Sequence, residues 1–213
     1  MTLRAGLAAA GGIVLAVQAA AQDLPDTDLR DLRIGMAVTE LPSAGYADFS
    51  CAAAAAVRIV GWPDWHDCPA GDDGLRALRF GYDATSRDGT VVAGHPVILT
   101  AVIDNSGTLE GLKIETDPAA RPYLRKRAFL LGPQVQARYG GEAWSCTQGS
   151  PQAGEESIGG VYLRERCTKT LTGRSLAIER NLFRHSGGDA PSIVDETRVT
   201  IFRAHAGTGM GSH

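Results

Sequence analysis

The chain has 213 residues, with 21 Lys and Arg against 24 Asp and Glu, and 44% of its residues are hydrophobic. This composition is typical of a globular protein and excludes a collagen, a coiled coil or a largely disordered chain. The formal charge of -3 argues against nucleic acid or an anionic membrane surface as a partner of the chain as a whole.

The first 21 residues are predicted to be a signal peptide. One charge, Arg4, precedes an apolar stretch over residues 5–17, and residues 19–21 are all alanine, which fits the A-x-A rule for signal peptidase. The stretch is too short for a transmembrane helix, and the alternative interpretation is a buried Ala-rich helix. Cleavage before Gln22 would deliver the mature chain to the periplasm or the cell exterior. No second apolar run approaches membrane length.

The mature chain is expected to begin with a flexible arm over residues 22–31, because this segment is polar. Residues 37–41 are expected to form one helical turn that ends at Pro42, and residues 46–51 a short strand. The stretch 61–69 is rich in Pro, Asp and Gly, which predicts a loop.

Strand signals begin after residue 75. Leu78, Phe80 and Tyr82 alternate with Arg79 and Gly81, a pattern typical of a half-buried strand. Similar runs separated by turn signals predict six strands, at residues 75–82, 97–102, 109–115, 161–168, 175–183 and 193–202.

A helix is predicted between the third and fourth of these strands. Asp117 can cap its start, with Pro118 at the first position. Gly132-Pro133 is expected to kink or break the helix, and Gly140-Gly141 to end it. The apolar seam consists of Leu124, Ala128, Leu131 and Val135, which recur at helical spacing.

Four cysteines remain in the mature chain, an even number for an oxidising compartment. Three pairings are possible. Cys51 with Cys68 and Cys146 with Cys167 close the shortest loops, and each disulfide would stabilise the fold by about 3 kcal/mol. Neither spacing matches the C-x-x-C pairs of a zinc site, so structural disulfides are expected.

The predicted fold class is α+β, with antiparallel sheet and a packed helix. Each half of the chain contains a helical segment, a Cys-bounded loop and three strands. Two tandem units, residues 32–116 and 117–204, are one arrangement; a single α+β domain with one continuous sheet is the other. Residues 205–213 are expected to be a disordered tail.

Residues 32–41, LRIGMAVTEL, resemble the helix opening of small bacterial envelope proteins. These are the outer-membrane assembly lipoproteins of the SmpA/BamE kind and the secreted β-lactamase inhibitor proteins. The chain resembles the inhibitor proteins in a second respect. Both have tandem helix-plus-sheet units, and in each unit one disulfide precedes the first strand. Both families bind other proteins and catalyse no reaction, so the resemblance implies a protein-binding role. The chain departs from them at Pro42, which shortens the helix, and in lacking a lipobox cysteine.

No motif in the sequence predicts catalysis. Gly173-Arg174-Ser175 lies in a predicted hairpin turn, whereas a nucleophile elbow needs a strand-to-helix turn. Phosphate-binding and dinucleotide-binding fingerprints do not occur. Asp64, His66 and Asp67, with Asp72 and Asp73 nearby, offer metal ligands, but without the register that a metal site needs. We expect no catalytic residue, no metal and no cofactor.

The sequence offers two candidate partner-binding surfaces. Trp62 and Trp65, next to His66, either cover the core or present aromatic anchors to a partner. The cationic residues of the predicted helix either face solvent or dock an acidic partner; they are Arg121, Arg125 and Lys126.

The function predicted from the sequence is that of an exported, non-catalytic protein-binding or scaffolding factor of the cell envelope. One alternative is a periplasmic carrier of a small ligand or metal, bound between helix and sheet. The other is a hydrolase without a recognisable motif.

Overall fold

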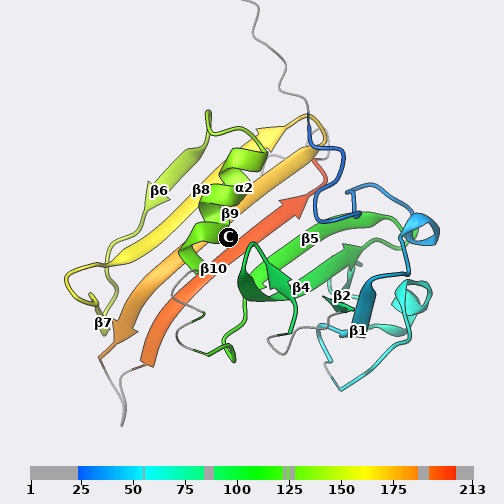
Figure 1. The fold of residues 1–213 in the computed structure, drawn as a ribbon, viewed down its shortest axis with the longest axis horizontal. Helices are drawn as coiled ribbons and strands as arrows, with labels where there is room; N and C mark the ends of the chain where they lie inside the picture. The colour runs from blue at the N-terminus through cyan, green and yellow to red at the C-terminus, as the bar shows by residue number, and fades with distance from the viewer. Residues whose placement is uncertain are drawn as a thin grey trace, which may run out of the picture.

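A computed structural model describes residues 24–54, 56–83, 89–121, 124, 128–186 and 192–204. Most of these residues belong to one twisted antiparallel sheet of ten strands (Figure 1). The strands are β1 (Tyr46–Cys51), β2 (Arg76–Tyr82), β3 (Val91–Val92), β4 (His95–Ile103), β5 (Leu109–Thr116), β6 (Ser145–Gln148), β7 (Glu155–Glu156), β8 (Leu163–Leu171), β9 (Arg174–His185) and β10 (Ser192–Phe202).

The main path of the sheet runs β1-β2-β4-β5-β10-β9-β8-β6, with β3 paired to β4 and β7 to β9. The strands of the first half therefore follow one another from the β1 edge to the centre, and those of the second half from the β6 edge to the centre. The halves meet where β5 pairs with β10, with Val199 opposite Ile114. Strands from both halves thus belong to one sheet.

One face of the sheet carries the core. In β9, Leu176 and Ile178 are buried, whereas the alternate residues Ala177 and Glu179 are partly exposed on the other face. The α-helix α2 (Leu131–Arg138) packs on the core face against β9 and β10, as Figure 1 shows. In β2, Leu78 and Phe80, which the period of two predicted on the buried side of the strand, are buried.

The predicted α+β fold class is wrong, because the described chain has no helical layer. Of the predicted helix after Asp117, the structure describes the helical residue Leu124, the 3-10 turn η3 (Ala128–Leu130) and the eight-residue α2. Pro133 lies in the first turn of α2, where proline is tolerated, so this residue stands near the start of the helix and does not break it. In the first half, the predicted helical turn is the three-residue 3-10 turn η1 (Val38–Glu40).

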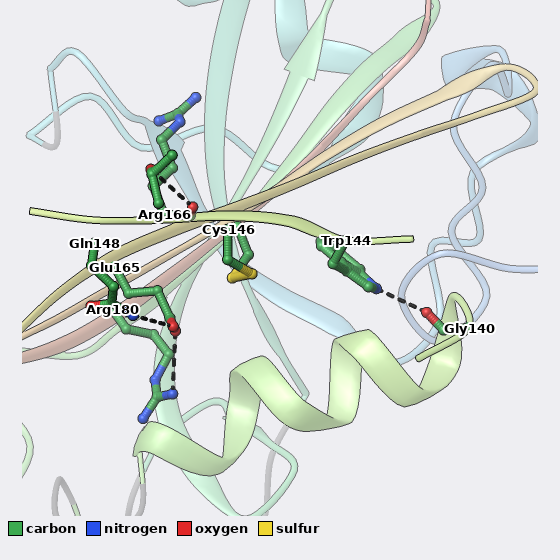
Figure 2. Close-up of a disulfide and its surroundings, with 9 residues drawn as sticks. Gly140, Trp144, Cys146, Gln148, Glu165, Arg166 and Arg180 are labelled. Carbon is green, nitrogen blue, oxygen red and sulfur yellow. Dashed lines mark hydrogen bonds and ion pairs between the residues drawn. A yellow bond between two sulfur atoms is a disulfide. The ribbon is translucent and has the colours of Figure 1, made fainter. Parts of the chain in front are cut away.

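Both predicted disulfides are present with the predicted pairing. Cys51 is bonded to Cys68, and Cys146 to Cys167. The second bond joins β6 to β8 on the side that faces α2 (Figure 2).

The end of α2 is bound to the sheet by a buried lysine. The Lys169 ammonium on β8 donates hydrogen bonds to the carbonyl oxygens of Tyr139 at 2.7 Å, Gly140 at 3.0 Å and Glu142 at 2.8 Å. These carbonyls lie at and just beyond the C-terminus of α2, where a cation is favoured by the helix dipole. One side chain therefore satisfies three backbone acceptors and fixes the helix on the sheet.

The N-terminal segment is also held by the second half of the chain. Asp28 and Leu29, within the segment predicted to be an arm, are buried. The carboxylate of Asp28 accepts hydrogen bonds from the Ile34 backbone N–H, the Tyr139 hydroxyl and the Arg174 guanidinium. Among the described residues, no helix is long and apolar enough to span a membrane.

Candidate functional site

The loop closed by the Cys51–Cys68 disulfide forms one end of the sheet. Its residues 57–59 run along the outer edge of β1, where Cys51 N–H donates to Val57 O at 3.0 Å and Ile59 N–H to Phe49 O at 3.2 Å. The 3-10 turn η2 (Trp62–Asp67) follows, and the Asp64 carboxylate accepts a hydrogen bond from Val60 N–H at 3.0 Å. The loop is therefore fixed at both ends and in the middle.

Trp62 is a core residue. Its side chain is 2% exposed, its indole N–H donates to Pro42 O at 2.9 Å, and its ring contacts Tyr46, Phe49 and Phe80. Of the two interpretations of the sequence, the first therefore holds for Trp62: its ring covers the core, and its indole is not available to a partner.

Trp65 and His66 lie nearer the surface. The Trp65 ring is half-buried against the turn at Gly107, and the Arg76 guanidinium carbon lies 5.2 Å from its ring centroid. His66 is exposed, with Nε2 3.8 Å from the carboxylate of Asp67. These two residues remain available as a contact surface.

Of the three cationic candidates, the structure describes one, Arg121. Arg121 is exposed just beyond β5, whereas Arg125 and Lys126 lie outside the described residues.

A groove with a mainly apolar lining lies beside the disulfide loop. Its volume is about 420 Å³, and Val60, at its rim, is 93% exposed, with Val57 42% exposed nearby. Burial raises the pKa of the lining residue Tyr46, so its phenol is neutral. The lining residues are Ser43, Tyr46, Phe49, Val60, Gly61, Trp62, Pro63 and Asp64.

Sequence reasoning missed the two valines. A signal was available, because Val57, Ile59 and Val60 are large aliphatic residues in a loop bounded by cysteines. Only Ile59 contacts the core as a partly buried residue.

The segment between Arg33 and Arg76 is acidic. Residues 34–75 contain one basic residue, Arg58, and six acidic ones: Glu40, Asp48, Asp64, Asp67, Asp72 and Asp73. Of these seven charged residues, Asp64 is half-buried and the other six are exposed. Among the described residues, no three His, Cys, Asp or Glu side chains converge as metal ligands.

The space between α2 and the sheet contains a smaller pocket of about 210 Å³. Its walls include the apolar residues Leu131, Val135 and Ile201, and its polar groups include Gln134 and Arg138. Pockets for small ligands commonly measure about 300–1,000 Å³, so this one is small for a carrier.

Comparisons with protein-family models, curated proteins and solved structures find no match to this chain.

Proposed function

We propose that the protein is exported through its N-terminal signal peptide and acts in the periplasm as a non-catalytic binding factor of the cell envelope. Two disulfides among the described residues support this proposal, because such bonds persist in oxidising compartments. N-terminal sequencing of protein from the periplasmic fraction should begin at Gln22. Recovery of exported protein that retains Met1 would contradict the export route.

The binding surface is the disulfide-closed loop and its groove. The observation that carries this assignment is Val60, which is 93% exposed on a segment held by hydrogen bonds and a disulfide. An exposed apolar side chain on a rigid loop loses little entropy on binding. The groove beside it can accept an apolar side chain of the partner.

The charge of this end of the molecule indicates the chemistry of the partner. Asp64 lines the groove, and five exposed acidic residues and Arg58 lie in the same segment, residues 34–75. The Arg30 guanidinium carbon lies 5.3 Å from the ring centroid of Tyr46, another lining residue. A complementary partner would present an apolar anchor within a Lys- and Arg-rich surface. Such an interaction should weaken as salt concentration rises.

Site-specific photocrosslinking in the periplasm tests this assignment. A photoreactive residue at position 60 should give a discrete adduct, whereas the same residue in place of Val161, which is 53% exposed in the second half of the chain, should not. The yield of this adduct should decrease as the salt concentration rises. In a second experiment the photoreactive residue replaces Val57, and the substitution Val60→Arg should then lower the yield of its adduct. Equal adducts at positions 60 and 161, or no adduct at either, would contradict the proposed surface.

The carrier function is the second candidate, and the pocket beneath α2 is the observation that favours it. Its volume of about 210 Å³ is below the usual range of about 300–1,000 Å³ for small-molecule pockets. The binding function is therefore preferred.

A further inference from the structure

The two edges of the sheet differ in whether another segment of the chain covers them. The outer edge of β1 is covered by residues 57–59, with which it forms backbone hydrogen bonds. At the opposite edge, β6 pairs with β8, and no described segment forms a backbone hydrogen bond with its outer side. All four residues of β6 are exposed, and Figure 1 shows the strand at the margin of the sheet.

The register of β6 shows which backbone groups face outward. Gly149 N–H donates to Arg164 O at 2.6 Å, so the odd-numbered residues of this segment form the hydrogen-bonded pairs with β8. Cys146 and Gln148 belong to the alternate pairs, consistent with the 4.0 Å between the Cα atoms of Cys146 and Cys167. Their N–H and C=O groups therefore point away from β8, toward the open edge.

Apart from its length of four residues, this edge lacks the usual features that prevent pairing of edge strands. Exposed edge strands commonly carry charged residues, proline or a bulge, whereas β6 reads Ser-Cys-Thr-Gln. The strand is also held in place, by the Cys146–Cys167 disulfide and by a hydrogen bond from the Gln148 amide to Glu165 at 2.6 Å (Figure 2). The edge is thus uncharged, ordered and short.

We propose that β6 pairs antiparallel with β6 of a second copy of this chain, about a two-fold axis at Thr147. In this register Cys146 of each copy lies opposite Gln148 of the other, and both residues direct their N–H and C=O groups into the new ladder. Pairing of identical surfaces about a two-fold axis closes on itself. Because the β1 edges are already covered, assembly stops at the dimer.

The charges permit this pairing. Thr147 is on the sheet face opposite α2, as is the neighbouring Arg166, which is paired with Glu179. The two copies of Arg166 would be separated by three strand spacings, about 14 Å, which exceeds the Debye length of about 8 Å at physiological salt. Since the paired strand is short, the interface falls below the size of stable complexes, about 1,200 Å², and the dimer should be reversible.

Charge exchange at position 147 tests the proposal with the full-length mature protein. The two Thr147 side chains would form a non-hydrogen-bonded pair, in which side chains lie closest. Analytical ultracentrifugation over a range of concentrations should show a wild-type dimer, unchanged in Thr147→Ser. Thr147→Lys and Thr147→Glu should each weaken dimerisation at least tenfold, and an equimolar mixture of the two should restore it. A wild-type monomer at all concentrations, or no recovery in the mixture, would overturn the proposal.

Gln148→Pro provides a second test, because it removes an outward N–H that β8 does not use. It should weaken dimerisation at least tenfold while the far-ultraviolet circular dichroism stays unchanged. A folded Gln148→Pro protein that still dimerises would place the contact elsewhere and overturn the assignment. Val60→Arg should dimerise normally, so failure of this proposal is distinguishable from failure of the binding function.

Discussion

The Asp28 carboxylate forms a buried ion pair with Arg174, 146 positions later in the chain, with Arg174 Nη2 3.0 Å from Asp28 Oδ2. The Asp28 side chain is 1% exposed and that of Arg174 12%. Burial, with the adjacent Asp28 charge and hydrogen bond, raises the pKa of Tyr139, so its hydroxyl remains a donor to Asp28. The first described residues are thereby fixed to the second half of the chain.

Asp28→Asn should lower the free energy of unfolding by about 3–5 kcal/mol, because it leaves the Arg174 guanidinium buried without its counter-charge. Urea denaturation at neutral pH measures the change. Tyr139→Phe is the control, since it removes one hydrogen bond to the same carboxylate and should cost about 1 kcal/mol. Similar midpoints for wild type and Asp28→Asn would show that the pair does not stabilise the fold.

Lys169→Met should destabilise the protein by about 2–4 kcal/mol, because three carbonyl oxygens at the end of α2 lose their charged donor. Lys113→Met, on the opposite sheet face, is the matched control and should change stability by about 0.5 kcal/mol or less. Thermal unfolding monitored by circular dichroism compares the two. Equal shifts would mean that the three hydrogen bonds of Lys169 contribute little.

Asp104 gives the turn before β5 a dependence on pH. Burial alone would raise the pKa of Asp104, but hydrogen bonds from the Ser106 hydroxyl and from the backbone N–H groups of Thr108 and Ser106 together lower it. The folded-state pKa is below the unfolded value of about 3.9, so this stabilisation is present above that pH and is lost as pH falls through the folded pKa.

Asp104→Asn should therefore cost about 1–2 kcal/mol at neutral pH, and the difference from wild type should shrink on acidification below about pH 4. Urea titrations at a series of pH values measure it. A difference that stays constant down to the acid limit would show that the charge of Asp104 is not responsible.

The two tryptophans of η2 should respond differently to truncation. Trp62→Ala removes a buried ring from the core and should cost about 3–5 kcal/mol. Trp65→Ala should cost about 1 kcal/mol, because its ring is half-buried and contacts Arg76 through a cation–π interaction. If the protein binds through this end, Trp65→Ala should also weaken partner capture about tenfold or more. Comparable losses of stability for both variants would make Trp65 a core residue.

The long strands were predictable from sequence because their side chains alternate between core and solvent. β1 was predicted with its observed bounds, and the other predicted strands lie within a few residues of β2, β4, β5, β8, β9 and β10. The short β6 was missed, because Ser145–Gln148 has no apolar alternation and is held by β8 and a disulfide. The predicted start of the helix at Asp117 was wrong, because residues 117–121 are not helical.

The candidate site was less predictable for a related reason. Trp62 and Trp65 have the same sequence context, and the position of each ring is decided by distant residues, Phe80 and Arg76 respectively. The exposure of Val60 likewise depends on residues 57–59 lying along β1, a contact that no local pattern encodes.

Each disulfide binds one of the two outermost strands, β1 through Cys51 and β6 through Cys146. A β-sheet commonly begins to open at its margins, where amide protons exchange with solvent through local fraying and not through global unfolding. At the β6 margin the disulfide joins the outermost strand to its neighbour β8, so in the oxidised protein β6 cannot separate from the sheet. At the β1 margin Cys51 is bonded to Cys68 in the loop that follows η2, and not to the neighbouring strand. Reduction would restore fraying at the β6 margin, and the kinetic lifetime of the native state then depends on the thiol balance of its surroundings.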